Sequence, residues 1–314
     1  MSKQPNPSDW SFNLEHAYDA VVRVHSAVPV DAYTADTLGV DRIGSGVVIR
    51  ADGLVLTMGY LITEAQSIWL TTRGGKVVPG HPLAYDSVSG FGLVMPLGDL
   101  DVSLLPLGSA DQLAQSDRVI LIGHGGPANA LVTMVSAKRE FAGYWEYLLD
   151  QAIITAPAHP QWGGAALVDV HGQLVGIGSL LVQEQRNGAS TDCNVVVPID
   201  LLKPILHDLL STGRRHGPVR PWLGVYVSDD TGQLVIAQVA AQSPAEQASL
   251  QRGDMILAVG AKRVNRLPDF YRALWQTGEA GCDVVCTIAR DGNLMTMRLR
   301  SADRAALLRK PLMH

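Results

Sequence analysis

Short apolar runs, separated by Gly, Pro and Asp, repeat along the first two thirds of the chain. Many short strands at turn-marked intervals favour an all-β barrel or sandwich. Residues 13–24 are typical of a short helix that continues into a strand, and leucines and an isoleucine recur at helical spacing over 199–210. The expected strands are residues 46–49, 54–57, 68–72, 92–96, 119–122, 131–137, 151–155, 165–168, 174–181 and 193–198.

The pattern changes after residue 210. Residues 211–219 are rich in Gly, Arg and Pro and indicate a linker. Beyond it we expect a strand at 234–239, a helix at 267–277 and a hairpin of 283–290 with 294–299. Ser243 and Glu246 form a capping box around Pro244, which predicts the start of another helix.

These patterns divide the chain into five parts. We expect a mobile N-terminal arm at 1–12, a β domain at 13–210, a linker at 211–219, a second domain at 220–302 and a tail at 303–314. A length of 314 residues is enough for two domains with cores of their own.

Composition excludes several classes of function. The net charge is −5, from 25 basic and 30 acidic residues, which gives no electrostatic reason to expect a nucleic-acid partner. No apolar stretch reaches the roughly 18 residues of a membrane-spanning helix. Residues 1–10 lack the apolar core of a signal peptide, so we expect a cytoplasmic protein, with a removed leader as the alternative. His, Cys, Asp and Glu show no metal-ligand spacing, so neither a metal nor a cofactor is expected.

The three cysteines fit a reducing compartment. Cys282 and Cys286 lie in one expected strand. At about 3.3 Å per residue their Cα atoms would be roughly 13 Å apart. A disulfide needs less than about 7 Å, so we expect free thiols.

Residues 44–49 and 52–57 resemble the first hairpin of the HtrA family of trypsin-fold serine proteases. They read Gly-Ser-Gly-Val-Val-Ile and Asp-Gly-Leu-Val-Leu-Thr. In that family the hairpin ends at Thr-x-x-His, where the His is the general base, and here Tyr60 follows Thr57 at that spacing. Residues 85–94 resemble the strand that carries the orienting Asp, and Gly90 stands at its position.

Residues 160–168 resemble the loop that carries the nucleophile in the same family. Trp162 precedes Gly163 and Gly164 where the family has a serine. The segment around Pro160 is one residue shorter than the family pattern, so the match of Trp162 rests on the glycine pair. The resemblance covers most of residues 17–210 and implies the double β-barrel of trypsin.

Three replacements argue against inherited peptidase chemistry. A tyrosine with a reference pKa of about 10 is a poor base near neutral pH. Gly90 has no side chain, and the indole of Trp162 has no nucleophilic oxygen. Removing one triad member from a serine protease leaves only roughly 10³–10⁴-fold catalysis over water. We therefore expect a pseudoprotease, with no catalytic residues at Tyr60, Gly90 and Trp162, and not an enzyme.

The alternative is an active serine-type endopeptidase or hydrolase with a relocated catalytic site. His159 lies near the altered loop in the sequence, and His124 lies in the turn at 123–127, which we expect to pack beside that loop. In the opposing interpretation, both residues are histidines of surface loops and have no catalytic role. The other candidates are His81 and His171, with Ser87, Ser89, Ser136 and Asp86 as partners.

Residues 220–227 and 251–260 resemble two parts of the PDZ domain of HtrA proteins. The first reads Arg-Pro-Trp-Leu-Gly-Val-Tyr-Val, like the carboxylate-binding loop, and the second contains Gly-Asp-x-Ile. The resemblance spans residues 220–300 and implies an α+β PDZ domain after the barrels.

The PDZ resemblance implies a peptide groove. The backbone N–H groups of Leu223, Gly224 and Val225 would bind a terminal carboxylate, and the peptide would add a strand beside residues 225–227, which include Tyr226 and Val227. Phe270 and Leu274 would line the pocket for the last side chain. The alternatives are an occluded structural turn at 223–225 and simple i, i+4 core packing of Phe270 on Leu274.

The two resemblances together imply a scaffold or chaperone-like subunit that binds peptide or protein C-termini. HtrA proteins form trimers through aromatic residues near the start of the protease domain. Trp10 and Phe12 occupy that region, so we expect a homotrimer or a subunit of a larger complex, with packing of both rings on their own barrel as the alternative.

Overall fold

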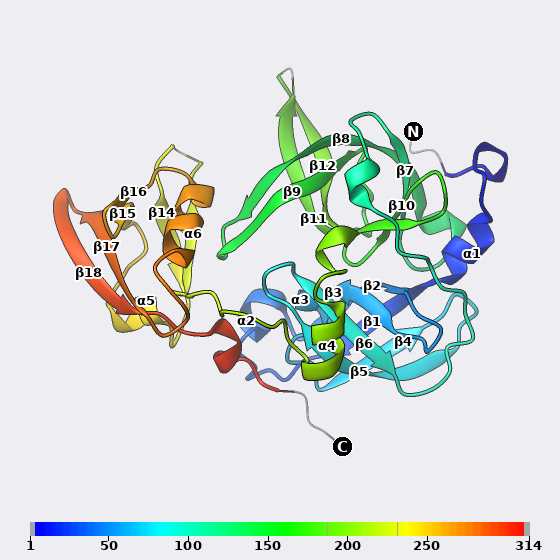
Figure 1. Cartoon of the computed structure of the whole chain (residues 1–314), viewed down its shortest axis with the longest axis horizontal. Coiled ribbons are helices and arrows are strands. Elements are labelled where there is room, and N and C mark those ends of the chain that lie inside the picture. Colours follow the sequence, from blue (N-terminus) through cyan, green and yellow to red (C-terminus); the bar gives the residue numbers. More distant parts are fainter. Residues whose placement is uncertain (1–3, 187, 231, 311–314) are drawn as a thin grey trace. The chain divides into compact units, whose positions relative to one another are not determined.

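The computed structural model describes residues 4–186, 188–230 and 232–310. The chain forms two compact units. The first unit consists of residues 1–139, 151–216 and 309–314, and the second consists of residues 140–150 and 217–308. Strands dominate both units (Figure 1).

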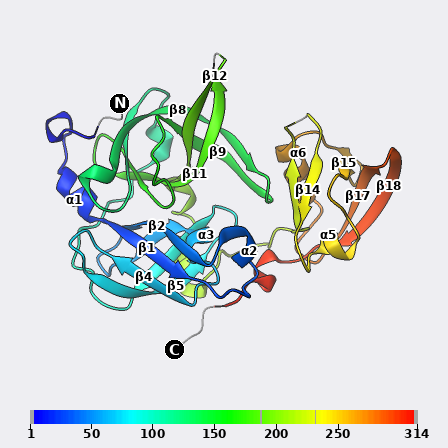
Figure 2. The ribbon, with the colours of Figure 1, turned by 180° about the vertical axis from the view of Figure 1, so that it is seen from behind.

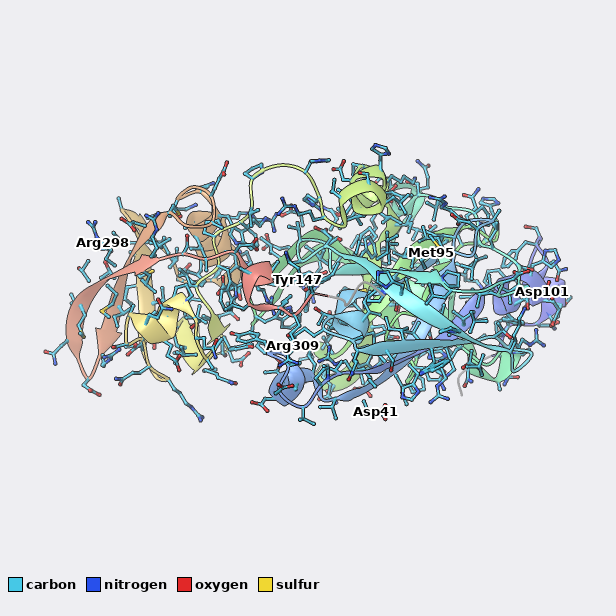
Figure 3. The ribbon with its side chains drawn as sticks, turned by 90° about the horizontal axis from the view of Figure 1, so that it is seen from below. Asp41, Met95, Asp101, Tyr147, Arg298 and Arg309 are labelled. Carbon is cyan, nitrogen blue, oxygen red and sulfur yellow. The ribbon has the colours of Figure 1, made fainter. Side chains whose placement is uncertain are left out.

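The first half of the first unit is a closed six-stranded barrel with the strand order β1-β2-β3-β6-β5-β4. Pairing of β1 with β4 closes it, with Arg23 opposite Thr71. Every residue of β3 is buried, as expected for a short apolar run inside a barrel. Asp41 in β2 and Met95 in β6 are labelled in Figure 3. The strands are β1 (Val21–Ala27), β2 (Asp41–Val48), β3 (Val55–Met58), β4 (Ser67–Thr71), β5 (Val77–Tyr85) and β6 (Phe91–Pro96).

The second half of the first unit is another closed barrel, ordered β10-β11-β12-β9-β8-β7 (Figure 2). Val119, Leu121, Ile153, Leu167 and Val196 are fully buried in its core. The strands are β7 (Arg118–Ile122), β8 (Ala130–Gly143), β9 (Tyr147–Ala156), β10 (Ala166–Val168), β11 (Leu174–Arg186) and β12 (Ala189–Pro198).

Short helices connect these strands. The expected helix at 199–210 is instead a 3₁₀ turn followed by α4. Pro204 lies between them, and proline lacks the N–H that a continuous helix needs and disfavours helical geometry in the preceding residue. The helices of this unit are η1 (Pro7–Asp9), α1 (Leu14–Asp19), α2 (Ala35–Leu38), α3 (Gly59–Ile62), η2 (Ala110–Gln112), η3 (Pro127–Asn129), η4 (Ile199–Leu201) and α4 (Leu206–Thr212).

The second unit contains an antiparallel sheet ordered β13-β14-β15-β17-β18, with β16 paired to β15. Ser243 caps the helix as predicted, since Glu246 N donates to Ser243 Oγ at 3.2 Å. The Glu246 carboxylate accepts from Gln242 N, one residue before the cap, at 2.6 Å. The elements are β13 (Val225–Ser228), β14 (Val235–Val239), α5 (Pro244–Gln247), β15 (Met255–Val259), β16 (Lys262–Arg263), α6 (Leu267–Trp275), β17 (Asp283–Arg290), β18 (Asn293–Arg300) and η5 (Arg304–Leu307).

Two features of the second unit bear on function. Strands β8 and β9 run together to a common tip (Figure 1), and residues 140–150 at that tip belong to the second unit. Cys282 and Cys286 form no disulfide, as their spacing predicts, and Cys193 is buried in the first unit.

Candidate functional site

A pocket of about 390 Å³ lies where the two barrels of the first unit meet. Residues of β1, β2 and α3 line it from the first barrel, and the segments after β7 and before β10 line it from the second. Tyr60 and Trp162, two of the three positions singled out by the family resemblance, are in this lining.

Close backbone contact joins the two halves of the pocket. Ser45 N donates to Gly163 O at 2.8 Å. Gly164 has φ +77°, and a Cβ at this residue would lie 1.8 Å from the Ser45 carbonyl oxygen. Only glycine fits this approach, which explains the second glycine of the pair.

Tyr60 is held by a hydrogen bond rather than poised as a base. Its hydroxyl donates to Ser179 O at 2.9 Å. Burial raises the pKa of this phenol far above its ordinary value, so the group stays protonated. The rings of Tyr60 and Trp162 are tilted, with centroids 6.4 Å apart.

Gly90 lies next to Tyr60 through the backbone. Gly59 N donates to Gly90 O at 2.7 Å, and Gly90 N donates to Asp86 O at 2.7 Å. The Asp86 carboxylate is buried and committed elsewhere: Ser89 Oγ donates to it at 2.6 Å and Arg215 Nη2 at 2.8 Å. The structure therefore brings the three family positions together without placing a carboxylate between them.

The pocket lining also contains a hydrogen-bonded histidine and serine, His124 and the fully buried Ser45. Ser45 Oγ lies 3.2 Å from His124 Nδ1 and also accepts from His124 N at 3.0 Å. Burial, with the nearby positive charge of Arg23, lowers the pKa of the His124 imidazole. His124 is therefore neutral at neutral pH, and its Nδ1 can accept the Ser45 hydroxyl proton.

The structure separates His124 from the other histidine candidates. His159 is buried, its Nδ1 accepts from Gln161 N at 2.9 Å, and its Nε2 lies 3.0 Å from Asn129 O. Both of its ring nitrogens are thus used in holding the loop. The remaining candidates lie outside the lining of the pocket. They are His81, His171, Ser87, Ser89, Ser136 and Asp86.

Sequence reasoning named His124 but missed Ser45 and Arg23. Ser45 stood in the Gly-Ser-Gly motif and was read only as part of the family resemblance. Its partner is 79 residues away in the chain. No local spacing could therefore signal the pair.

Within the part of the chain that the structure describes, no group of three or more His, Cys, Asp or Glu side chains could hold a metal ion. Among the same residues, no helix combines the length and the apolarity needed to cross a membrane.

The predicted carboxylate-binding loop of the second unit converges on a single side chain. Leu223 N, Gly224 N and Val225 N donate to Glu146 Oε1 at 3.2, 2.7 and 3.1 Å. Gly224 has φ +83°, and a Cβ there would lie 2.2 Å from Ser243 Cβ. The loop is therefore an anion-binding nest that depends on glycine.

The other residues predicted for the peptide groove lie around this nest. Tyr226 is half-buried on β13. The apolar members are buried in one cluster, which contains Leu223, Val225, Val227, Phe270 and Leu274. Sequence reasoning missed Glu146, which belongs to the distant β8–β9 hairpin.

The two aromatic residues predicted for an oligomer interface contact each other and their own barrel. The rings of Trp10 and Phe12 meet edge to face, with centroids 6.0 Å apart. The Arg118 guanidinium lies 5.2 Å from the centroid of the Trp10 ring, and the Phe12 ring lies against Gly172.

Comparison with known proteins matches both units. The family model described as a trypsin-like peptidase domain matches residues 44–177, and a PDZ domain model matches residues 221–300. The serine endoprotease DegS of Haemophilus influenzae is 25% identical over 299 residues, which cover 89% of this chain and 85% of that protein. The chain belongs to the HtrA family.

Other HtrA relatives are longer. A probable periplasmic serine endoprotease of the DegP-like type from Hahella chejuensis is 27% identical over 70% of this chain and 49% of its own. A DegP-like protein of Chlamydia trachomatis is 25% identical over 79% of this chain and 52% of its own. The chain thus spans about half the length of these DegP-like relatives.

Solved structures confirm the fold class, a trypsin-like double barrel followed by a PDZ domain. The HtrA-type protease AlgW with a decapeptide has a TM-score of 0.54 at 20% identity, covering 96% of this chain and 100% of that one. The serine endoprotease of Yersinia pestis has a TM-score of 0.53 at 19% identity, covering 92% and 96%.

Two expectations from the sequence are contradicted. The expectation that the chain is not an enzyme is opposed by relatives named as serine endoproteases. That expectation considered only three positions, whereas the pocket also contains the Ser45–His124 pair. The expected cytoplasmic location is opposed by relatives described as periplasmic. It had rested on the first ten residues and on the three cysteines.

Proposed function

We propose that this HtrA-family chain is a serine-type peptidase with a relocated catalytic pair, Ser45 and His124, and that its PDZ domain binds peptide C-termini. The hydrogen bond between Ser45 Oγ and a neutral imidazole, at a pocket that both residues line, carries the proposal. Ser45 is fully buried, so a substrate must displace the side chains that cover it before Ser45 Oγ can attack. The relatives named as serine endoproteases support it.

In this proposal Ser45 Oγ attacks the carbonyl carbon of the scissile bond as its proton passes to His124 Nδ1. His124 then gives that proton to the leaving amine, and water hydrolyses the acyl group on Ser45. Arg23 lines the same pocket and would place positive charge near the oxyanion of the tetrahedral intermediate. Trp162 and Leu61 would form an apolar wall for the substrate.

The pair is a dyad. Among the described residues, no carboxylate is hydrogen-bonded to His124. In the serine-protease template, disabling the carboxylate that orients the histidine lowers kcat by about 10⁴. We therefore expect slow turnover, and active-site labelling is a more sensitive assay than proteolysis.

A fluorophosphonate probe tests the assignment. Wild type should gain one adduct, and mass spectrometry of the digest should place it on Ser45. Ser45→Ala and His124→Gln should abolish labelling and any slow cleavage of casein. Ser136→Ala is the matched control, because Ser136 Oγ bonds to Ile154 O away from the pocket.

Labelling of Ser45 that survives in Ser136→Ala would support the peptidase. An unlabelled wild type that unfolds cooperatively on heating would remove the catalytic part of the proposal and leave peptide binding. An adduct on another serine would refute the assignment of Ser45 and identify that serine as the nucleophile.

We also propose that the PDZ groove binds peptide or protein C-termini and so gives the chain a scaffold or chaperone-like role. The convergent N–H groups of Leu223, Gly224 and Val225 support this, since such a nest suits a carboxylate. Isothermal titration with a carboxyl-terminal peptide and its amide measures the binding. Equal affinities for the two would contradict a carboxylate site.

The HtrA resemblance motivates a further proposal, assembly into a homotrimer or a larger complex through Trp10 and Phe12. Light scattering of wild type and Trp10→Ala decides it. A trimer that dissociates on substitution supports the interface, and a monomeric wild type excludes the homotrimer.

A further inference from the structure

The nest of the PDZ domain is occupied by the chain itself. Glu146 lies at the tip of the β8–β9 hairpin and is 8% exposed. Its carboxylate accepts hydrogen bonds from three consecutive backbone N–H groups, at residues 223–225. This is the arrangement that a terminal carboxylate would adopt in the loop.

One backbone hydrogen bond joins the same segment to β13, the strand beside which a bound peptide would lie. Val227 N donates to Tyr144 O at 2.9 Å. Tyr144 precedes Glu146 by two residues, and Val227 follows Val225 by two. The backbone contact of Tyr144 and the side-chain contact of Glu146 are therefore two residues apart on both segments, which is the spacing of a strand added beside β13.

An apolar side chain completes the likeness. Leu148 is 8% exposed and belongs to the same buried cluster as Leu223, Val225, Phe270 and Leu274. One hairpin thus supplies both parts of a C-terminal residue: Glu146 the carboxylate, and Leu148 an apolar side chain for the cluster that lines the groove.

Further contacts hold the segment in place. The Tyr271 hydroxyl donates to Gly143 O at 2.7 Å and accepts from Glu146 N at 3.2 Å. Arg304 Nη1 donates to Trp145 O at 3.3 Å. Trp145 also stacks on Tyr147, which is labelled in Figure 3, with ring centroids 5.6 Å apart.

We propose that residues 143–148 are an intramolecular ligand of the PDZ groove, with the Glu146 side chain in the place of a terminal carboxylate. A peptide with a free C-terminal carboxylate and an apolar last residue competes with this segment for the groove. The claim that a peptide competes for the groove rests on the proposed function, the binding of peptide C-termini by the PDZ domain. The claim that Glu146 occupies the nest rests only on the contacts within the second unit.

Two properties of the ligand follow from the contacts. An amide at the peptide C-terminus would bring two N–H donors to a nest made of donors, so it should bind poorly. A peptide must also displace the segment already present, so its apparent affinity falls by the fraction of molecules whose groove is open.

Hydrogen exchange tests the occupied nest in the full-length protein. The variant Glu146→Ala removes the acceptor of three N–H groups, so the amides of residues 223–225 should exchange at least ~10-fold faster than in wild type. Asp150→Asn is the matched control, because Asp150 lies on the same hairpin, is exposed and pairs with Arg272 outside the nest. Its exchange at 223–225 should equal that of wild type.

Peptide binding tests the competition. The probe is a fluorescein-labelled hexapeptide ending in Tyr-Trp-Leu with a free carboxylate, and its C-terminal amide is the control. Glu146→Ala should bind the free acid at least ~10-fold more tightly than wild type or Asp150→Asn. The amide should bind weakly to all three proteins.

The two measurements separate the two claims. Unchanged exchange at 223–225 in a folded Glu146→Ala protein, checked by circular dichroism, would overturn the intramolecular ligand. Faster exchange without peptide binding would support the intramolecular ligand and refute peptide capture. Faster exchange with equal peptide affinity in wild type and variant would overturn the competition.

Discussion

Raising the pH from 5 to 8 should loosen the hold of Glu146 on the PDZ nest. Burial raises the pKa of this carboxyl from 4.5 to about 7, against the lowering effect of the three N–H groups and of the Arg304 charge. The docked side chain therefore binds a proton that the released, solvated side chain gives up over the same range.

The sign and size follow from linkage. Because the docked pKa is the higher one, docking is strongest below pH 4.5 and weakens as the pH rises through about 7. A shift of one pKa unit corresponds to about 1.4 kcal/mol. Between pH 5 and 8 the docking free energy should fall by about 2–3 kcal/mol, a factor of several tens.

Fluorescence polarisation with the free-acid hexapeptide measures this effect. In wild type the apparent affinity should rise by more than ~10-fold from pH 5 to pH 8 relative to Glu146→Gln. The glutamine keeps the shape and the acceptor oxygen but does not titrate. The groups that face Glu146, including Arg304, Tyr226, Tyr271 and Cys286, and the carboxylate of the peptide itself are common to both proteins.

Parallel pH profiles for wild type and Glu146→Gln would refute this reasoning. An affinity that falls with pH in wild type alone would refute it more strongly, since it would require a docked pKa below the free value.

Three further outcomes test the first unit. Gly164→Ala should lower the free energy of unfolding by at least about 2 kcal/mol in urea titration, because its Cβ would meet Ser45 O at 1.8 Å and its φ is positive; an unchanged midpoint would contradict the contact. Tyr60→Phe should cost about 1–3 kcal/mol in the same assay, because Ser179 O loses its donor, and no loss would mean that water replaces it. Burial opposes ionisation of Glu64, yet hydrogen bonds from a hydroxyl and from backbone N–H groups lower its pKa. Its contribution to stability should thus be complete above pH 4.5 and disappear as the pH falls through the lowered value, a loss that Glu64→Gln should not show.

Local patterns in the sequence determined much of the architecture. Short apolar runs between turn residues predicted most of the barrel strands, because the burial of a strand leaves a signal within a few residues. The Ser243 cap was readable for the same reason, since a helix cap is formed by residues three apart. The prediction of one helix over 199–210 was wrong at Pro204. Proline has no N–H to donate, so the helix is interrupted there despite the helical spacing of the apolar side chains.

The Ser45–His124 pair and the occupied nest were decided by tertiary structure. Ser45 and His124 come from different barrels, which approach closely at Gly164, where a Cβ would lie 1.8 Å from Ser45 O. Glu146 is 78 residues from Gly224, and in the sequence it is an ordinary acidic residue of a hairpin loop. Which loop reaches which surface depends on how closed barrels orient their hairpins, and that geometry is set by contacts across the whole fold rather than by neighbouring residues.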